Sequence, residues 1–339
     1  MTTAVAVDLG KTGCRAVLWT DDGGHAPRVH EVPGAPGLAA GDGVATAHAA
    51  VRAAVLPLLD REPSQRPSAV CVGAAGAAAA PEAARALAGL LLEDLAANEV
   101  AVTSDAVTAH AGALGGRTGV VLAIGTGSVA IGIGDDGSYA RVDGWGPWLG
   151  DEGSGAWIGA AGLRAALRAH DGRGPGTALL AAAVKRFGEP DRLPSAVGRG
   201  GNPARTAASF APDVAQAAAA GDTTAKAILR SAAAALGETV LAAARRIGTG
   251  GAHPVTVTGG LTGLGEPLLG PLRSALAGSP HPLDPRPPLG DPLDGARLLA
   301  LDASAPHEPH VARVRRATLT APNPPVTTSA VSQECACAN

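Results

Sequence analysis

The chain has 339 residues and a formal net charge of −3, and only 2% of its residues are aromatic. This length allows two domains with sizeable cores, and a near-neutral charge without a Lys/Arg run excludes an extended nucleic-acid surface. Ala, Val and Leu supply most of the apolar content, which is typical of helices packed on Val-rich strands. We therefore expect an α/β protein that binds no nucleic acid.

The N-terminal residues and the cysteines indicate the cellular compartment in which we expect the protein. The first residues, MTTAVAVDLG, lack the basic and apolar regions of a signal peptide, and no apolar stretch has the length of a membrane span. The cysteines Cys14, Cys71, Cys335 and Cys337 have the spacing of neither a disulfide framework nor a zinc site. We expect a cytoplasmic protein that binds no membrane.

The first third of the chain predicts strands and helices in alternation. A strand over 4–7, a glycine-rich turn and a strand over 15–19 form a predicted hairpin, which an Asp-Asp-Gly-Gly turn at 21–24 closes. The hairpin is followed by a helix over 44–60, a strand over 69–73, a helix over 81–96 and a strand over 99–103. This alternation favours a parallel or mixed sheet.

The opening pattern returns at residue 119. Strands over 120–124 and 129–133 flank a second turn of small residues, and an Asp-Asp-Gly turn at 135–137 closes the pair. An internal duplication of one α/β unit explains this repeat. Helices are then expected over most of 156–250, before a strand over 255–258 that leads into a Gly-Gly turn and a helix.

Both small-residue turns expose backbone N–H groups that could hold phosphates. A single turn of this kind is more often an ordinary hairpin, but two in one chain could clamp a nucleoside triphosphate. Asp8, at the end of the first strand, could hold Mg²⁺ through water, and adjacent glycines after 255–258 would let a flat ligand approach the backbone. The phosphate and nucleotide candidates are Gly10, Lys11, Thr12, Thr126, Gly127, Ser128, Gly259 and Gly260.

Asp105 follows the strand at 99–103 and starts a predicted helix. Its carboxylate would lie at the carboxyl edge of the sheet, where α/β proteins bind ligands, and it could accept a hydroxyl proton during phosphoryl transfer. An ordinary helix N-cap is the alternative.

The segment GWGPWLGDEGSGAWIG, residues 144–159, holds three of the four tryptophans. The paired acids Asp151 and Glu152 precede a helix, where the helix dipole alone would favour them. Aromatic faces beside carboxylates would also suit a sugar ring. In that interpretation Trp145 belongs to the sugar site, and Trp148 and Trp157 are packing residues.

Together these motifs resemble the N-acetylglucosamine kinase-like branch of the sugar kinase/Hsp70/actin superfamily, grouped with the BadF/BadG ATPases. The resemblance covers about residues 4–300 and is greatest to the bacterial glucosamine kinases. The matching segments are DLGKTGCR, AIGTGS, VTGG, SDA and GWGPWLGDEGSGAWIG. The resemblance implies two ribonuclease-H-like (actin-like ATPase) domains, with ATP and an amino sugar in the cleft between them.

The resemblance also implies a role for each candidate. Asp105 would take the proton from the sugar 6-hydroxyl, and Asp8 would help to place Mg²⁺. The two turns would hold the phosphates of ATP, with Lys11 in place of the usual small residue. Gly259 and Gly260 would border the adenosine. The sugar site would consist of Asp105, Gly144, Trp145, Asp151 and Glu152.

The expected domains follow from the same resemblance. Residues 1–115 form the first domain, which a helix near 293–303 completes, and residues 116–292 form the second domain with a helical insertion. Residues 304–339 are rich in Pro, Ser and Thr, so we expect a disordered tail. A homodimer is a further expectation from the resemblance alone.

Several functions stay open. Asp151 and Glu152 favour glucosamine, whose amine is cationic, but the same acids could bind the hydroxyls of N-acetylglucosamine. A dehydratase-activating ATPase would need cysteines at a helix start for an iron–sulfur cluster, whereas Cys14 and Cys71 lie in or next to strands. A sugar-responsive repressor would need a helix-turn-helix before the first hairpin. A sugar-binding protein without catalysis would not need Asp8 and Asp105.

Overall fold

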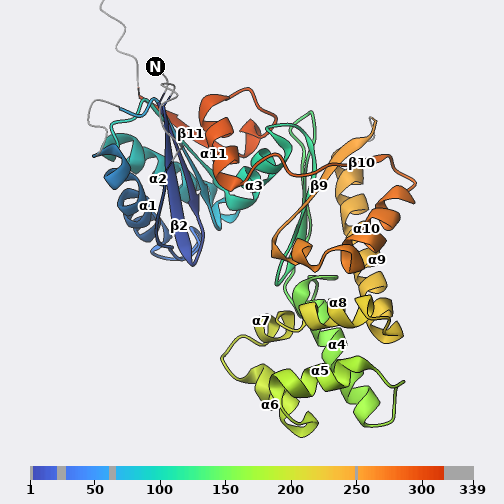
Figure 1. The fold of residues 1–339 in the computed structure, drawn as a ribbon. Coiled ribbons are helices and arrows are strands. Elements are labelled where there is room, and N and C mark those ends of the chain that lie inside the picture. The colour runs from blue at the N-terminus through green and yellow to red at the C-terminus, as the bar shows by residue number, and fades with distance from the viewer. Residues whose placement is uncertain (1–2, 21–27, 61–65, 249–250, 317–339) are drawn as a thin grey trace, which may run out of the picture.

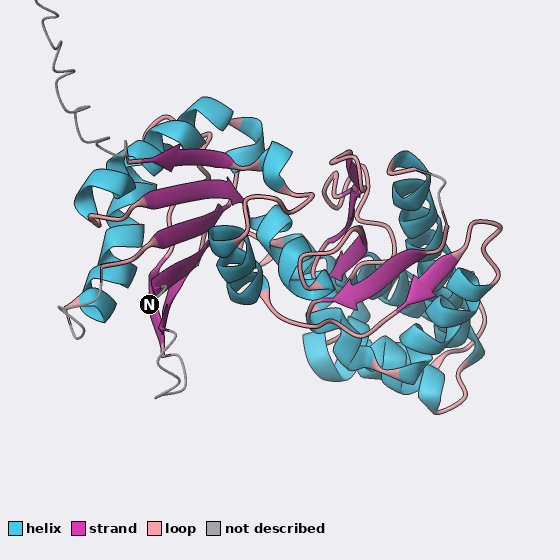
Figure 2. Ribbon diagram, turned by 90° about the horizontal axis from the view of Figure 1, so that it is seen from above, coloured by secondary structure: helices cyan, strands magenta, loops and turns pink. Residues whose placement is uncertain are grey.

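A computed structural model describes residues 3–20, 28–60, 66–248 and 251–316 of the chain. Two lobes stand next to each other, each built on its own β-sheet, and a group of helices extends below the second lobe (Figure 1). Seen from above, helices flank both sheets (Figure 2). The fold is therefore mixed α/β with two sheets, as the sequence predicts.

The first lobe contains a six-stranded sheet in the order β11-β5-β4-β1-β2-β3. Strands β1, β4 and β5 are parallel, whereas β2, β3 and β11 pair with their neighbours in antiparallel fashion. The strands are β1 (Thr3–Leu9), β2 (Gly13–Thr20), β3 (Val29–Pro33), β4 (Ala69–Ala74), β5 (Glu99–Ser104) and β11 (Ala312–Arg315).

Alternating residue size explains how helices cover the two faces of this sheet. Val5 and Val7 pack in one cluster with α1 (Gly43–Leu59) and α2 (Pro81–Asp94), whereas Ala4 and Ala6 face α3 (Asp105–Leu114) and α11 (Pro292–Leu301). Successive strand residues point to opposite faces, so one face is bulky and the other small.

Helices α3 and α11 cross at glycines. A Cβ atom added to Gly112 would lie 1.9 Å from the carbonyl oxygen of Asp291, and one added to Gly295 would lie 1.9 Å from that of Thr108. These two glycines allow the helix axes to approach closely.

The second lobe contains a five-stranded sheet in the order β10-β9-β6-β7-β8. Its strands are β6 (Gly119–Ile124), β7 (Ser128–Ile133), β8 (Tyr139–Asp143), β9 (His253–Thr258) and β10 (Leu283–Pro285). Its helices are α4 (Gly155–His170), α5 (Ala178–Phe187), α6 (Leu193–Gly198), α7 (Pro203–Ala208), α8 (Ala211–Ala219), α9 (Thr223–Arg246) and α10 (Glu266–Ala277). Short 3₁₀ helices lie at Ala77–Ala79, Pro190–Arg192, Gly260–Leu264 and Glu308–His310.

Helix α9 is the central helix of the second lobe. It contacts β6, β7 and β8 and packs against α8 and α10. Among the described helices it alone has the length and apolar composition of a membrane span, but half of that stretch is buried inside the fold. This burial is what a core helix requires.

The expectation of a tail that is disordered from residue 304 onward is wrong for residues 304–316. Strand β11 pairs with β5, so that Ala312 lies opposite Val102. Arg313 forms ion pairs with Glu99 and Glu308, and its side chain is almost fully buried. Composition alone hides this strand, because it is held by pairing with β5 and by Glu99, which lies 214 residues before Arg313 in the chain. Residues 317–339 lie outside the described residues, as does the expected turn at 21–24.

The other elements agree with the sequence to within a few residues, apart from short strands that it did not indicate. Strands β3, β8 and β10 each have five residues or fewer. Helix α11 contacts β1 and α3 in the first lobe. The division of the chain between residues 115 and 116 stays a prediction.

Candidate active site

The first phosphate turn is a tight hairpin tip at the end of the sheet opposite the N-terminus (Figure 1). The amide of Gly10 donates to the carbonyl oxygen of Gly13 over 2.9 Å, and Lys11 and Thr12 are exposed. The loop after β3 lies against this tip, since a Cβ atom on Gly34 would lie 2.2 Å from the Gly10 oxygen. The tip therefore has a fixed backbone and free side chains.

Asp8 faces Arg15 across the hairpin. The two residues are register partners, and the Arg15 guanidinium lies 2.6 Å from the Asp8 carboxylate. Within the described part of the chain, no three His, Cys, Asp or Glu side chains form a group that could hold a metal ion. A magnesium ion at Asp8 would therefore take most of its oxygen ligands from water and from phosphate, as Mg²⁺ commonly does.

The second phosphate turn is joined to the acidic segment. The amide of Gly155 donates to the carbonyl oxygen of Gly125 over 2.8 Å, and the amide of Ala156 donates to that of Thr126 over 3.1 Å. The Ser128 hydroxyl donates to the carbonyl oxygen of Glu152 over 2.9 Å. Phosphate turn, acidic pair and the start of α4 are thus one hydrogen-bonded unit.

Asp143 organises the loop that carries the acids. Its two carboxylate oxygens accept the backbone amides of Asp151 and Glu152, over 2.7 and 2.9 Å. Asp143 and Asp151 both have a positive φ, near 60°, which non-glycine residues seldom adopt. Such a backbone needs surrounding support, and Asp143 supplies part of it. No pattern in the sequence indicates this role for Asp143.

A hollow of about 460 Å³ brings candidates from both phosphate and sugar motifs together. A Cβ atom on Gly127 would lie 2.6 Å from a carboxylate oxygen of Asp151, so the turn and this acid nearly touch. The lining includes Gly127, Ser128, Gly144, Asp151 and Gly259.

Glu152 points elsewhere. It lines a separate hollow with Trp145, Leu149 and Glu238. The left-handed backbone at Asp151 accompanies this divergence of two consecutive acids. Asp151 and Glu152 therefore do not face the same hollow.

The tryptophans differ in burial. Trp145 is 66% exposed, and the Arg141 guanidinium lies 5.3 Å from its ring centroid. Trp148 is 91% exposed, so the prediction that it is a packing residue is wrong within a single chain. Trp157 is half-buried and packs against the core of the second lobe. The reason is local: Trp157 lies on α4, whereas Trp148 lies on a loop.

Asp105 is not the N-cap of α3. The Ser104 side chain accepts the Val107 amide and caps α3, so Asp105 is the first helical residue. Neighbouring protein atoms desolvate its carboxyl and raise its pKa, although solvent still reaches the residue. The charge of Asp8 also raises this pKa, and that of Lys11 lowers it. Asp8 and Lys11 are therefore near enough to Asp105 for their charges to act on it.

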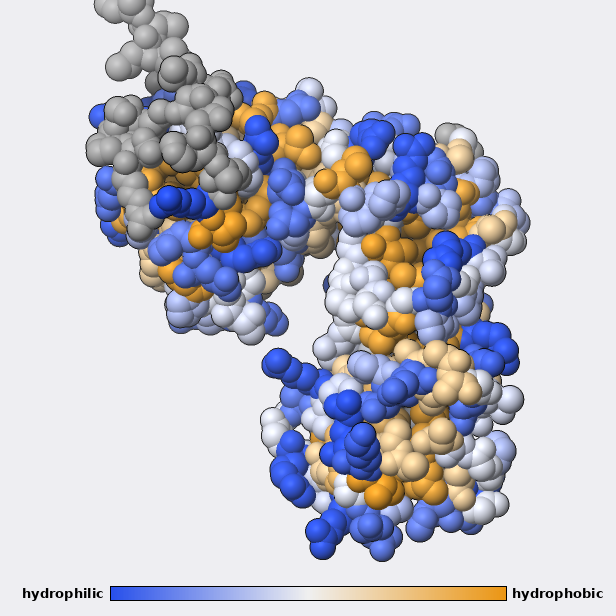
Figure 3. Space-filling model, in the orientation of Figure 1, coloured by the Kyte–Doolittle hydropathy of each residue, from blue (hydrophilic) through white to orange (hydrophobic). Residues whose placement is uncertain are grey.

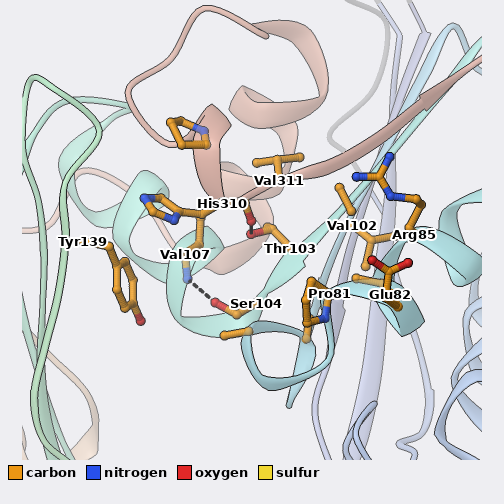
Figure 4. A pocket seen from close by; sticks show the side chains of 15 residues that line it. Pro81, Glu82, Arg85, Val102, Thr103, Ser104, Val107, Tyr139, His310 and Val311 are labelled. Atoms are coloured by element: carbon orange, nitrogen blue, oxygen red, sulfur yellow. Dashed lines mark hydrogen bonds between the residues drawn. The ribbon is translucent and has the colours of Figure 1, made fainter.

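The region between the two lobes is open to solvent. The space-filling view shows an open hollow between the first lobe and the helices below the second (Figure 3). A smaller hollow of about 360 Å³ lies beside Ser104, at the junction of the lobes. Tyr139 of β8 and His310 lie on its one side, and Glu82 and Arg85 of α2 lie on its other side (Figure 4). Burial raises the pKa of Tyr139, and the charge of Asp105 raises it further.

The adenosine candidates lie where β9 ends. Gly259 has a φ of +97°, and a Cβ atom there would lie 2.3 Å from the carbonyl oxygen of Ile124. Gly260 is exposed, and a Cβ atom there would meet nothing within 4 Å. Only Gly259 is required by the packing.

The family model for the BadF/BadG/BcrA/BcrD ATPase family matches residues 5–276. The chain belongs to this family. A candidate N-acetylglucosamine kinase from Chromobacterium violaceum is 30% identical, with a TM-score of 0.64 over 89% of this chain and 99% of that one. A second candidate N-acetylglucosamine kinase, from Porphyromonas gingivalis, has a TM-score of 0.62 at 20% identity, over 89% of this chain and 99% of that one. The lobes thus have the actin-like ATPase fold of sugar kinases.

Curated relatives match over a shorter stretch. An N-acetylmuramic acid/N-acetylglucosamine kinase from Clostridium acetobutylicum is 32% identical over 117 residues, 33% of this chain and 36% of that protein. An N-acetyl-D-glucosamine kinase from Dictyostelium discoideum is 34% identical over 87 residues, 25% of this chain and 27% of that protein. The matches thus span about a third of the length of these relatives.

Proposed function

We propose that the protein transfers the γ-phosphate of ATP to the 6-hydroxyl of an amino sugar. The observation that carries the proposal is the contact of Gly127 with Asp151, which places a phosphate turn and a sugar candidate in one hollow. The names of the family's relatives, which are amino-sugar kinases, support it. We also propose that the protein is located in the cytoplasm, where ATP is available. That it forms a homodimer stays a prediction.

Asp105 would act as the general base. Its raised pKa suits this role, because a base works best when its pKa lies closer to the operating pH. Lys11 and Thr12 from one turn, and Thr126 to Ser128 from the other, would hold the phosphates. Asp8 would hold magnesium through water, and the ion would neutralise charge on the phosphates as the phosphoryl group transfers. Approach of the lobes would exclude water from the hollow between them.

Glucosamine and N-acetylglucosamine are the two acceptors to compare. Asp151 lines the hollow at the second phosphate turn and could pair there with the amine of glucosamine. Glu152 faces another hollow, which removes half of the negative charge expected there. The relatives' names support N-acetylglucosamine, and one of these names also includes N-acetylmuramic acid.

The two cysteines within the described residues do not favour an ATPase with an iron–sulfur cluster. Cys14 and Cys71 are buried free thiols, and burial raises the pKa of each to about 12. Such thiols are poor metal ligands, since the thiolate is the form that binds.

The test is ADP release with ATP and Mg²⁺, measured for glucosamine, N-acetylglucosamine, glucose and N-acetylmannosamine. Asp105→Asn should lose at least a hundredfold in kcat/KM. Asp60→Asn, at an exposed acid where α1 ends, is the matched control and should keep wild-type rates. Absence of sugar-dependent ADP release with every sugar would overturn the proposal.

A further inference from the structure

Arg141 is a cation beside the second phosphate turn, and the proposed function so far gives it no role. It belongs to β8 and lines the same hollow as Gly127, Ser128 and Gly259. Among the described residues that line this hollow, it is the only Lys, Arg or His. A phosphoryl group in transfer carries negative charge on its three outer oxygens, so a guanidinium in this position would stabilise it.

The pleat of β8 directs Arg141 away from the helices of the second lobe. Ala140 is buried in the core of that lobe and Val142 packs against it, so Arg141 between them lies on the opposite face of the sheet. Tyr139, two residues earlier, lies on the same face as Arg141 and lines the hollow at the junction of the lobes (Figure 4). The face that carries Arg141 is therefore the one turned toward this junction.

The side chain of Arg141 extends along β8 toward the phosphate turn. Its Nη2 donates to the carbonyl oxygen of Gly144 over 2.5 Å. A Cβ atom on Gly144 would lie 3.1 Å from this nitrogen and 3.0 Å from the Val129 side chain. Val129 directly follows Ser128, the last residue of the turn. The guanidinium thus lies next to the strand end that carries the turn.

Two contacts orient the guanidinium and leave most of its donors available. It lies 5.3 Å from the ring centroid of Trp145, a cation–π contact. Arg carries five N–H donors, and within the described part of the chain the bond to Gly144 is the only one that this side chain makes. Asp151 lines the same hollow, yet no ion pair joins it to Arg141. The two opposite charges therefore leave room for a ligand between them.

The charge of Arg141 also reaches the junction of the lobes. Burial raises the pKa of Tyr139, whereas the charge of Arg141 lowers it and that of Asp105 raises it. Arg141 and the proposed base come from different lobes, and both are near enough to this tyrosine for their charges to act on it.

We propose that Arg141 is a catalytic residue that binds the phosphoryl group during its transfer. The inference rests on the proposed kinase function. The sugar 6-oxygen bonds to the γ-phosphorus while the bond from that phosphorus to the bridging oxygen of ADP breaks, and the hydroxyl proton passes to Asp105. Arg141 gives up no proton in this step, because guanidinium stays protonated. Its free N–H groups donate to the outer oxygens of the phosphoryl group, and its charge offsets theirs.

The kinetic test compares variants at Arg141 in the assay of ADP release. Arg141→Gln should lower kcat/KM for ATP at least a hundredfold, and Arg141→Lys should keep part of the activity because it keeps the charge. Added guanidinium chloride should restore part of the activity of Arg141→Ala and none of that of Asp105→Asn. Arg297→Gln is the matched control and should keep wild-type rates, since Arg297 is an exposed residue of α11 that lies 5.5 Å from the ring centroid of Trp19.

Binding without ATP separates contact with phosphate from mere support of the loop at Gly144. After transfer the phosphoryl group belongs to the sugar, so Arg141 should also hold the 6-phosphate of the product. Calorimetry would compare glucosamine and N-acetylglucosamine, each with its 6-phosphate. Arg141→Gln should raise the Kd of the 6-phosphates at least tenfold and change the Kd of the free sugars less than twofold. If Arg141→Gln does not fold, Arg141→Lys should show the same selective loss at smaller size.

The outcomes distinguish this inference from the kinase proposal. Equal kcat/KM in wild type and Arg141→Gln would overturn the inference, while turnover by wild type would still support the kinase. The same loss of affinity for free and phosphorylated sugars would also overturn it, because it would assign Arg141 to support of the loop. Absence of sugar-dependent ADP release by wild type would instead overturn the kinase proposal.

Discussion

The carboxylate of Asp143 accepts the backbone amide of Asp151 over 2.7 Å, and its second oxygen accepts the next amide. Asp143→Ala removes both bonds from a loop with two left-handed non-glycine residues. We expect it to lower kcat/KM for the sugar at least tenfold, because Asp151 would lose its fixed position. The loss of stability should be about 1–3 kcal/mol, measured by urea unfolding.

Asp143→Asn is the conservative comparison. Asn tolerates the left-handed backbone and keeps one acceptor oxygen, so its losses should be smaller than those of Asp143→Ala. Equal kcat/KM in wild type and Asp143→Ala would show that the loop does not position the acid.

The raised pKa of Asp105 predicts the acid side of the pH profile. The base must be ionised, so kcat/KM should fall as pH decreases through a value above the ordinary Asp pKa of about 3.9. The Lys11 charge lowers this pKa. Lys11→Gln should therefore move the acid limb to higher pH, whereas Lys11→Arg should leave it in place. A limb that does not move in Lys11→Gln would refute the shared site.

Removal of the Asp105 charge should not weaken the fold. An acid with a raised pKa in the folded state binds its proton more tightly there than in the unfolded chain. Folding stability therefore decreases as pH rises through this range, and ionised Asp105 opposes folding at neutral pH. Asp105→Asn should be inactive with a Tm at or above that of wild type. A clearly lower Tm would point to a structural role for the carboxylate.

Local pattern and hairpin symmetry predicted that residues of the second turn, the acidic segment and the Gly-Gly turn lie together, whereas their roles stay predictions. Strand ends and turns bring five of the predicted residues to one hollow, namely Gly127, Ser128, Gly144, Asp151 and Gly259. Other features depended on the backbone or on distant partners. The sequence could not show that the left-handed Asp151 sends the next acid elsewhere, or that a loop leaves a tryptophan exposed.

Some missed contacts had a signal in the sequence. The partner of Asp8 could have been found, because a tight tip in the first hairpin pairs it with Arg15. Strand β11 had no comparable signal. Four residues of mixed polarity form it, and they are ordered by pairing with β5 and by the ion pairs of Arg313.

The two glycines after β9 should respond differently to alanine. Gly259→Ala would force a Cβ atom to 2.3 Å from the Ile124 carbonyl oxygen at a φ of +97°. The strain should cost more than 1 kcal/mol and should raise the KM for ATP. Gly260→Ala has open space and should keep the wild-type Tm. Equal Tm values for the two variants in thermal unfolding would contradict this assignment.

The buried pair His110 and His307 should make the fold sensitive to acid. His110 Nδ1 and His307 Nε2 are 2.9 Å apart, and His110 Nε2 lies 3.0 Å from the carbonyl oxygen of Gly119, where the second lobe begins. Since this carbonyl can only accept, His110 donates to it and accepts from His307. The chain of bonds joins α3, the C-terminal segment and the second sheet, with both histidines neutral.

Burial lowers the pKa of His110 to about 4 and that of His307 to about 3. An unfolded histidine titrates near 6.5, so below that pH the unfolded chain binds protons that the folded chain refuses. Stability should therefore fall as pH decreases from about 6.5 toward 4, by on the order of 2 kcal/mol per histidine between pH 7 and pH 5. Urea unfolding at a series of pH values measures this slope.

His307→Gln keeps a donor toward His110 but removes one titrating group. It should reduce the loss of stability between pH 7 and pH 5 by about half. His170→Gln, at an exposed histidine in the last turn of α4, is the control and should keep the wild-type slope. If His307→Gln and wild type lose the same stability over this interval, the buried pair is not the source of acid sensitivity.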